Sequence, residues 1–290
     1  MAAGAGYQGS SPHRSHLLCS RFVYLRGRYV EQRTIPLGER PARLWTGGKG
    51  DAIVLLHGGW AGAEAYWSTI TDDLEKSHLV VAPELPGIGT VDEPPLPTFS
   101  AYAAWLAALL DALGIERAVI VGNSLGASVA WRFAGDYPER CRSLVMVNGY
   151  PPPAYPSGVR WLAAKTPLRA MARGNVAQFY GHEVLGLAFH DRAKVPAGIA
   201  QSLERFSRAD IDRVLDIMLS GEPPSPPPKS KTLLIWGEAD RSPVFDKQGA
   251  RKMRQSLDES KLVTIPEAGH LPQVERPAEF RRALRDFLKA

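Results

Sequence analysis

Short apolar runs recur along the chain and alternate with longer segments of helical periodicity. Strands that are buried on both faces show little polar alternation, which is typical of a parallel sheet covered by helices. The pattern therefore predicts an α/β fold with a doubly wound, mainly parallel sheet. The runs that fit are AIVLLHG (52–58), HLVVAPELPG (78–87), RAVIVGNSLG (117–126), SLVMVNGY (143–150), TLLIWGEAD (232–240) and KLVTIPEAGH (261–270).

Two of the other segments carry helix boundaries. Ser100 is placed to cap a helix over 101–113, and Gly114 follows as a left-handed stop. Near the C-terminus, Pro277 fits the first turn of another helix. Apolar residues on one face of that helix predict that it lies against the sheet, and they are Phe280, Leu284, Phe287 and Leu288.

The alternation stops between two proline-rich segments, PPPAYP and GEPPSPPPKSK, which we interpret as hinges or stiff spacers. We expect residues 151–228 to form a helical cap inserted into an α/β core of residues 21–150 and 229–290. Residues 1–20 are small and polar, and we expect a flexible leader. The cap prediction rests on an apolar helical stripe, which consists of Ile211, Val214, Leu215, Met218 and Leu219.

Composition and charge exclude several classes of protein. The net charge is +5, but the arginines are scattered and no basic strip with interleaved aromatic residues is found, so we expect no nucleic-acid partner. Cys19 and Cys141 have no metal-ligand spacing and do not suggest a disulfide scaffold. No run approaches the ~20 apolar residues that cross a bilayer, so we expect a cytoplasmic protein without a membrane span. The oligomeric state is left open.

A single serine lies between two glycines in VIVGNSLGA, directly after a predicted strand. Gly122 and Gly126 flank Ser124 at two residues on each side and leave room for a sharp strand-to-helix turn, on which a nucleophilic hydroxyl would protrude. The alternative is an ordinary glycine-rich connection in which the serine only caps the helix. Because the motif follows a strand and precedes a helical segment, the sequence favours Ser124 as a nucleophile.

Two further strand ends offer the groups that such a serine requires. Asp240 follows one predicted strand and His270 follows the next, and the carboxyl ends of parallel strands meet at one edge of the sheet. We expect His270 to take the proton of Ser124, and Asp240 to hold the imidazole in the right tautomer. Glu238 is the reserve acid, and Asp246 is a weaker choice because it is expected to begin a helix.

The segment LLHGGW is the expected source of an oxyanion hole. The N–H groups of Gly59 and Leu125 are placed to face the charge that develops on a tetrahedral intermediate. His57 is expected to brace the loop rather than to act as a base. Trp60 is expected to contact the substrate as a wall of the acyl pocket, or else simply to pack.

The motifs HGGW, ELPGIG, GNSLG, WGEADR and GHLPQVERPAEF occur in an order that resembles the α/β-hydrolase superfamily from about Asp51 to the C-terminus, except for the cap. The resemblance implies a mainly parallel eight-stranded sheet with a helical lid after the sixth strand. It also implies a Ser124-Asp240-His270 triad and chemistry that needs no cofactor or metal.

A serine nucleophile implies an acyl-enzyme, so we expect hydrolysis of a small to medium, fairly apolar ester or lactone. The alternative is a C–C bond hydrolase of meta-cleavage type, which GNSLG and WGEADR resemble. Three positions depart from the pattern: Leu271, expected to contact substrate, stands where those enzymes commonly have tryptophan, Ala127 stands in place of their longer glycine run, and Glu84 stands where the family usually has aspartate. A lyase or cyclase and a ligand-binding receptor on the same scaffold also stay open. The cap arginines available for an acidic substrate are Arg160, Arg169, Arg173 and Arg205.

Overall fold

A computed structural model describes residues 31–89, 93–153, 183–220, 222–242 and 247–289, with a few further positions between 170 and 177. The predicted leader, Asp246, Arg160 and Arg169 lie outside the described residues. Within them, eight strands form one sheet in the order β1-β2-β4-β3-β5-β6-β7-β8. The strands are β1 (Glu31–Ile35), β2 (Ala42–Gly47), β3 (Ala52–Leu56), β4 (Leu79–Pro83), β5 (Ala118–Asn123), β6 (Cys141–Val147), β7 (Thr232–Gly237) and β8 (Ser260–Ile265).

The sheet is mainly parallel, as the sequence predicts. Strands β3 to β8 pair in parallel, whereas β1 and β2 are antiparallel to each other and β2 is antiparallel to β4. Strands β3 and β5 are buried along their whole length, which agrees with their lack of polar alternation. The eight-stranded α/β fold is therefore confirmed.

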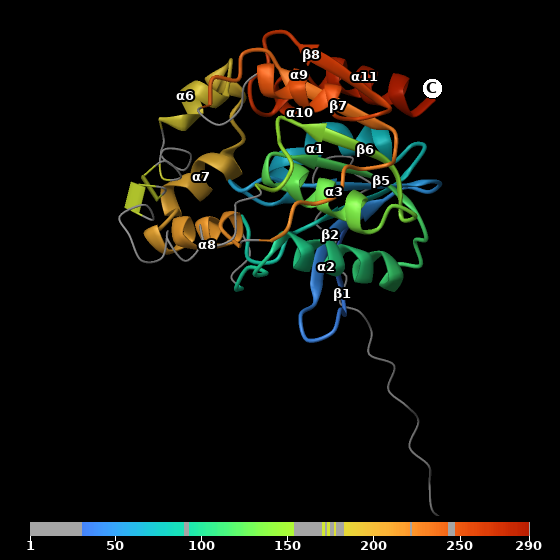
Figure 1. Cartoon of the computed structure of the whole chain (residues 1–290). Helices are drawn as coiled ribbons and strands as arrows, with labels where there is room; N and C mark the ends of the chain where they lie inside the picture. Colours follow the sequence, from blue (N-terminus) through green and yellow to red (C-terminus); the bar gives the residue numbers. More distant parts are fainter. Residues whose placement is uncertain are drawn as a thin grey trace, which may run out of the picture.

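Helices cover both faces of the sheet (Figure 1). Alternate residues of each strand point to opposite faces, so Val54 packs in one apolar cluster and Ile53 in the other. The first cluster contains α2, α3 and α9, and the second contains α1 and α11. These helices are α1 (Ala63–Leu74), α2 (Phe99–Ala112), α3 (Leu125–Asp136), α9 (Lys247–Gln255) and α11 (Pro277–Lys289), and the short α10 (Pro272–Glu275) precedes α11.

The start of α2 differs from the prediction. Thr98, not Ser100, is the N-cap, and its side chain accepts a hydrogen bond from Ala101 N. The N–H groups of Phe99 and Ser100 donate instead to the carboxylate of Glu222, at 2.7 and 2.9 Å. The capping of α2, which the sequence predicts for Ser100 alone, is therefore shared between Thr98 and the carboxylate of the distant Glu222. Gly114 has a φ of +67° and ends the helix as predicted.

The described residues between β6 and β7 contain helices and no strand. We refer to residues 183–220 as the insert, which lies to one side of the sheet in Figure 1. Of the predicted apolar stripe, Leu215 and Leu219 are buried, and the other three residues, Ile211, Val214 and Met218, are partly buried. The division into core and cap at 151–228 stays a prediction. The helices of the insert are α6 (Val184–Ala188), the 3-10 turn η1 (Arg192–Lys194), α7 (Ala197–Arg205) and α8 (Arg208–Met218).

None of the helices in the described part of the chain is long and apolar enough to span a membrane.

Candidate active site

Ser124 lies in the sharp turn between β5 and α3. Its backbone has φ 55° and ψ −118°, a conformation that costs energy for any residue with a side chain. The turn is possible because its neighbours are glycines: a Cβ on Gly122 would lie 2.2 Å from Gly126 O, and one on Gly126 would lie 2.4 Å from Leu56 O. The sequence spacing of the two glycines therefore reflects backbone segments in direct contact.

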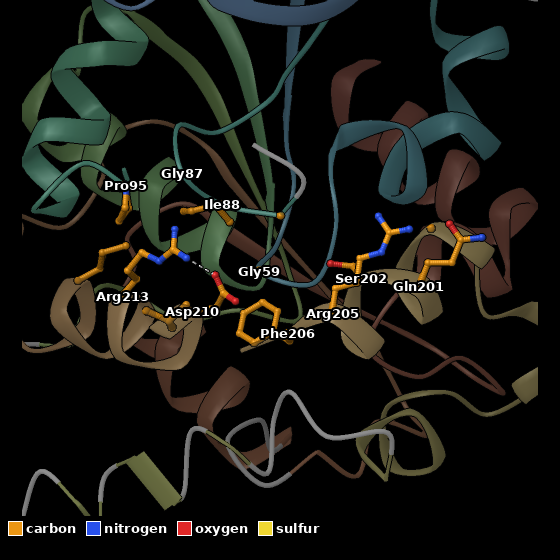
Figure 2. Close-up of a pocket in the computed structure, with 14 residues that line it drawn as sticks. Gly59, Gly87, Ile88, Pro95, Gln201, Ser202, Arg205, Phe206, Asp210 and Arg213 are labelled. Atoms are coloured by element: carbon orange, nitrogen blue, oxygen red, sulfur yellow. Dashed lines mark hydrogen bonds and ion pairs between the residues drawn. The ribbon is translucent and has the colours of Figure 1, made fainter. Parts of the chain in front are cut away.

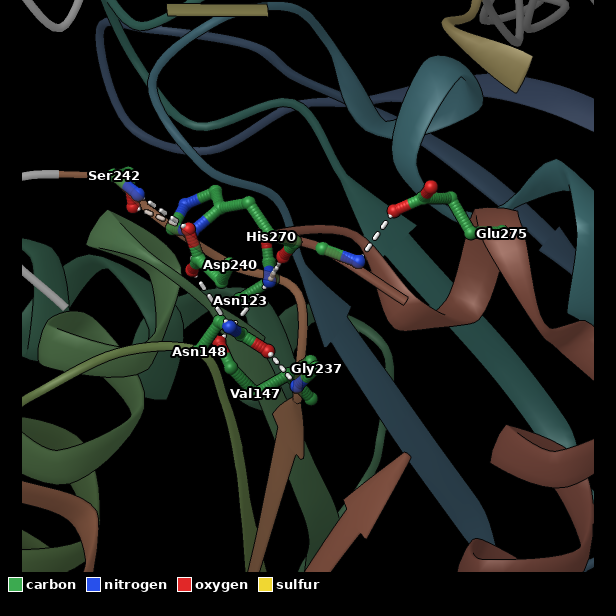
Figure 3. A network of polar contacts seen from close by, with 9 residues as sticks. Asn123, Val147, Asn148, Gly237, Asp240, Ser242, His270 and Glu275 are labelled. Carbon is green, nitrogen blue, oxygen red and sulfur yellow. Dashed lines mark hydrogen bonds and ion pairs between the residues drawn. The ribbon is translucent and has the colours of Figure 1, made fainter. Parts of the chain in front are cut away.

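Asp240 and His270 meet after β7 and β8, as the sequence predicts. The Nδ1 of His270 lies 2.8 Å from Oδ2 of Asp240, and both side chains are buried. The other carboxylate oxygen, Oδ1, accepts hydrogen bonds from the backbone N–H and the hydroxyl of Ser242 (Figure 3). A buried carboxylate needs such partners, because an unpaired charge in the interior is costly. The network holds Asp240 as an acceptor toward the imidazole.

Asn148 is a further member of this network that the sequence analysis missed. Its Nδ2 donates to Oδ2 of Asp240 at 2.7 Å, and its Oδ1 accepts from Gly237 N at 2.9 Å (Figure 3). Its backbone lies in the left-handed region with φ 39°. The sequence carried a signal for it, because Asn148 follows the strand of SLVMVNGY just as Asp240 and His270 follow theirs.

Asn123 joins the serine turn to the histidine loop. Asn123 immediately precedes Ser124, and its Nδ2 donates to the backbone oxygens of Val147 at 3.0 Å and His270 at 3.1 Å. The structure therefore brings the elements that carry Ser124 and His270 to the same edge of the sheet. The carboxylate of Glu238 follows β7 as well, but Glu238 is exposed and it is Asp240 that reaches the imidazole.

The two residues expected to contact substrate are both buried. The ring of Trp60 packs against the ring of His270, with centroids 4.9 Å apart. Leu271 is fully buried in the apolar cluster that contains α1 and α11. The substrate role of both residues stays a prediction.

His57 occupies the loop of the predicted oxyanion hole. Its Nε2 lies 2.9 Å from Leu85 N, and its Nδ1 lies 2.7 Å from Gly58 O, so the neutral ring with its proton on Nδ1 satisfies both partners. Burial lowers the pKa of His57, and the nearby Glu84 and the Gly58 hydrogen bond oppose this only in part. These contacts agree with a brace between the loops after β3 and β4.

A pocket of about 310 Å³ opens between the insert and the core. Gly59 lines it on the core side, and Arg205, Phe206 and Arg213 line it on the insert side (Figure 2). Leu125, the second predicted oxyanion donor, is the first residue of α3, where N–H groups have no acceptor within the helix. Ser124 is half-buried and is not among the residues that line this pocket.

The arginines described between β6 and β7 differ in what they contact. Arg213 pairs with Asp210 at 2.5 Å (Figure 2), and Arg173 pairs with Asp212 at 2.7 Å. Arg205 is exposed to the pocket, and no ion pair to it is found within the described residues. The same part of the chain holds no cluster of three or more histidine, cysteine or acidic residues suited to a metal ion.

Comparison with known proteins agrees with this architecture. The chain belongs to the alpha/beta hydrolase family, whose family model matches residues 53–283. It is 26% identical to 2-hydroxy-6-oxo-2,4-heptadienoate hydrolase of Pseudomonas putida over 84% of this chain and 91% of the relative. It is 28% identical to 2-hydroxymuconate semialdehyde hydrolase of Pseudomonas putida, over 83% of this chain and 88% of that relative.

A solved structure has the same fold. It is 2-hydroxy-6-oxo-6-phenylhexa-2,4-dienoate hydrolase from Rhodococcus sp. strain RHA1, with a TM-score of 0.68 at 23% identity, covering 90% of this chain and 99% of that one. The protein is therefore a hydrolase of the α/β fold. The names of the relatives agree with the C–C hydrolase alternative better than with the ester or lactone that the sequence analysis placed first.

Proposed function

We propose that this hydrolase cleaves the carbon–carbon bond beside the ketone of a small unsaturated keto acid, with Ser124, Asp240 and His270 as its catalytic residues. The observation that carries the proposal is the pocket in which Gly59 of the predicted oxyanion loop and the cationic Arg205 of the insert lie together. The relatives, which are named for dienoate and semialdehyde substrates, support this substrate class.

In the proposed reaction, Oγ of Ser124 adds to the ketone carbon while Nε2 of His270 takes the hydroxyl proton. The charge on the former ketone oxygen faces the N–H groups of Gly59 and Leu125. The adjacent C–C bond then breaks, and its electron pair goes to the bonded carbon of the conjugated fragment. That carbon takes the proton from His270. Water, with its proton removed by His270, cleaves the remaining acyl ester and releases Ser124.

Arg205 is proposed to bind the carboxylate of the substrate. Arg213 lies on the same insert and Arg173 precedes it in the chain, but each already has an acidic partner, whereas Arg205 faces the pocket. A hydrogen bond to a charged group contributes about 1.5 to 3 kcal/mol. The substrate is accordingly a small organic anion, and its reacting end must extend from the pocket to Ser124.

Covalent labelling tests the nucleophile. A fluorophosphonate probe forms a stable adduct with an activated serine, so the wild-type chain should be labelled and Ser124→Ala should not. Mass spectrometry of the labelled peptide identifies the modified residue. Absence of a Ser124-dependent adduct would favour a ligand-binding receptor on the same scaffold and would reject the hydrolytic mechanism.

Substrate turnover then separates the C–C hydrolase from the ester hydrolase. A 2-hydroxy-6-oxo-dienoate should be consumed, as measured by loss of its dienone absorbance, faster than neutral 4-nitrophenyl esters of graded acyl length. Arg205→Gln should raise KM for the acidic dienoate by roughly 10- to 100-fold, the value of one hydrogen bond to a charge, and leave KM for the neutral esters unchanged.

The matched control is Arg208→Gln, because Arg208 is an exposed arginine three positions further on and does not line the pocket. It should leave both KM values at the wild-type level. Rapid turnover of esters without turnover of the dienoate would instead support the ester or lactone hydrolase.

A further inference from the structure

Glu275 is a buried carboxylate at the end of α10. It is 1% exposed, and its two oxygens accept three backbone hydrogen bonds. Oε2 accepts from Gly269 N at 2.6 Å, and Oε1 accepts from His190 N and Asp191 N, both at 2.9 Å. Figure 3 shows the side chain reaching from its helix toward the loop that carries His270.

The donors come from two separate parts of the chain. Gly269 immediately precedes His270, whereas His190 and Asp191 connect α6 to η1 in the insert. Oε2 of Glu275 therefore binds the histidine loop, and Oε1 binds the insert. Lys194 of the insert adds a hydrogen bond from Nζ to the backbone oxygen of Glu275 at 2.8 Å.

The insert also contacts the loops of the candidate site through its backbone. His270 N lies 2.5 Å from Ala188 O, and Arg241 N, one residue after Asp240, donates to Leu187 O at 2.9 Å. The approach is close, because a Cβ on Gly269 would lie 1.8 Å from Ala188 O. The backbone that carries His270 thus has its position fixed by the insert as well as by the sheet.

The arrangement does not gain its stability from an ion pair. No lysine or arginine side chain pairs with the Glu275 carboxylate within the described residues. Burial raises the pKa of Glu275, although the three N–H groups and the nearby His190 oppose the shift. Burying a carboxylate without a cation is costly, and what the carboxylate provides here is a fixed geometry between the two segments that donate to it.

We propose that Glu275 is a positioning residue for His270, which ties the histidine loop to residues 190 and 191 of the insert so that the imidazole and the insert are placed together. The proposal rests on the proposed roles of Ser124 and His270. In this view the insert contributes to the proton transfer itself, through the position of the base, in addition to enclosing the substrate.

Glu275→Gln is the most informative substitution. The glutamine keeps the size of the side chain but has only one acceptor oxygen, so its amide N–H₂ must face either Gly269 N–H or the two N–H groups of the insert. The matched control is Glu222→Gln, which makes the same chemical change in a carboxylate that accepts the N–H groups of Phe99 and Ser100 at the start of α2. Both variants lose backbone hydrogen bonds, but only the first disturbs the histidine loop.

Two readouts distinguish positioning from general stability. The first is the second-order rate constant for fluorophosphonate labelling of Ser124, measured against pH. The second is the low-field proton NMR signal of the Nδ1 proton between His270 and Asp240, which reports that hydrogen bond without any reaction. Glu275→Gln should slow labelling at least about tenfold and shift or broaden the proton signal. Glu222→Gln should change the labelling rate by no more than about twofold and leave the proton signal at its wild-type position.

Glu275→Asp is the second variant and is measured in the same way. It keeps both acceptor oxygens but is one methylene shorter, so it should fall between the wild type and Glu275→Gln. Wild-type labelling in a folded Glu275→Gln, or equal slowing in Glu275→Gln and Glu222→Gln, would overturn the proposal. Failure of the wild-type chain to label would instead reject the proposed function, and the proton signal would still test the position of His270.

Discussion

The two halves of the candidate site are held in place by different means. Ser124 lies in a turn closed by backbone contacts, where Gly122 and Gly126 leave no space for a Cβ. Asp240 and His270 lie in loops held by side-chain hydrogen bonds, in which Asn148 is a donor to the carboxylate. One half is built by steric exclusion, and the other by directed polar contacts.

This difference predicts which property each half loses when it is altered. Steric contacts are insensitive to protonation and cannot be rearranged, so a change in the serine turn should lower stability first. Hydrogen bonds set direction, so a change in the loops should lower turnover while the fold persists. The following substitutions test this comparison, from the largest expected effect to the smallest.

Asp240→Asn should have the largest effect. An asparagine amide can donate to Nδ1 of His270, which favours the tautomer that cannot accept the Ser124 proton. We expect the labelling rate and turnover to fall by roughly 10³- to 10⁴-fold, as is typical of such a change, with a circular dichroism spectrum like that of the wild type. Activity close to the wild-type level would move the acid role to Glu238.

Gly126→Ala should be the most destabilising change in the serine turn. The new Cβ would lie 2.4 Å from Leu56 O and 2.5 Å from His57 O, and both are backbone atoms that cannot move away singly. We expect a loss of about 3 kcal/mol in the free energy of unfolding, measured in urea.

Gly198→Ala in α7 is the control for Gly126→Ala. The added Cβ there meets Ala65 Cβ at 3.5 Å, an ordinary contact, and alanine favours helix. The free energy of unfolding of Gly198→Ala should equal that of the wild type or be slightly higher. Equal effects of the two substitutions would show that the close contacts of the serine turn relax easily.

Asn148→Ala should have an intermediate effect on turnover. It removes one hydrogen bond to the Asp240 carboxylate and the acceptor for Gly237 N. A hydrogen bond to a charged group contributes about 2 kcal/mol, so we expect labelling to be roughly thirtyfold slower. Unchanged labelling in a folded variant would mean that Ser242 alone is sufficient to orient the carboxylate.

His57 should give the smallest effect, seen as a pH dependence of stability. Because burial lowers its pKa in the folded chain, the neutral ring contributes stability that is fully present above pH 6.5 and is lost as the pH falls toward the lowered pKa. His57→Gln should be less stable than the wild type at pH 7.5 but lose less stability between pH 7.5 and 5.5. Urea unfolding at the two pH values measures this, and parallel losses would assign the acid sensitivity to other groups.

The strands that position the site could be predicted because they are buried on both faces, and AIVLLHG, RAVIVGNSLG and TLLIWGEAD correspond to β3, β5 and β7. The hairpin of β1 and β2 lies at the edge of the sheet, where β1 is mostly only partly buried and β2 alternates between buried and more exposed residues. No single run in the sequence indicated it, and the expectation of eight strands came from the family resemblance.

The site could be predicted only where a functional residue lies in the loop after a strand and carries a side chain typical of catalysis. Asp240 and His270 satisfy that rule, and the hydrogen bond between them agrees with it. Glu275 could not be found in this way, because its partners are backbone N–H groups whose convergence depends on how the insert meets the core. Likewise, the contact of Glu222 with the first N–H groups of α2 depends on the tertiary fold, so the sequence did not predict that Thr98 and Glu222, rather than Ser100, cap this helix.

The contact between Gly269 and Ala188 also bears on how this molecule could be diversified. One way to change the substrate selectivity of this enzyme would be to replace the insert between β6 and β7 with that of a related enzyme. Here a transplanted segment would have to offer a carbonyl oxygen in the place of Ala188 and two consecutive N–H groups in the place of His190 and Asp191. Chimeras that retain residues 187–191 of this chain should therefore be recovered in active form more often than those joined within them.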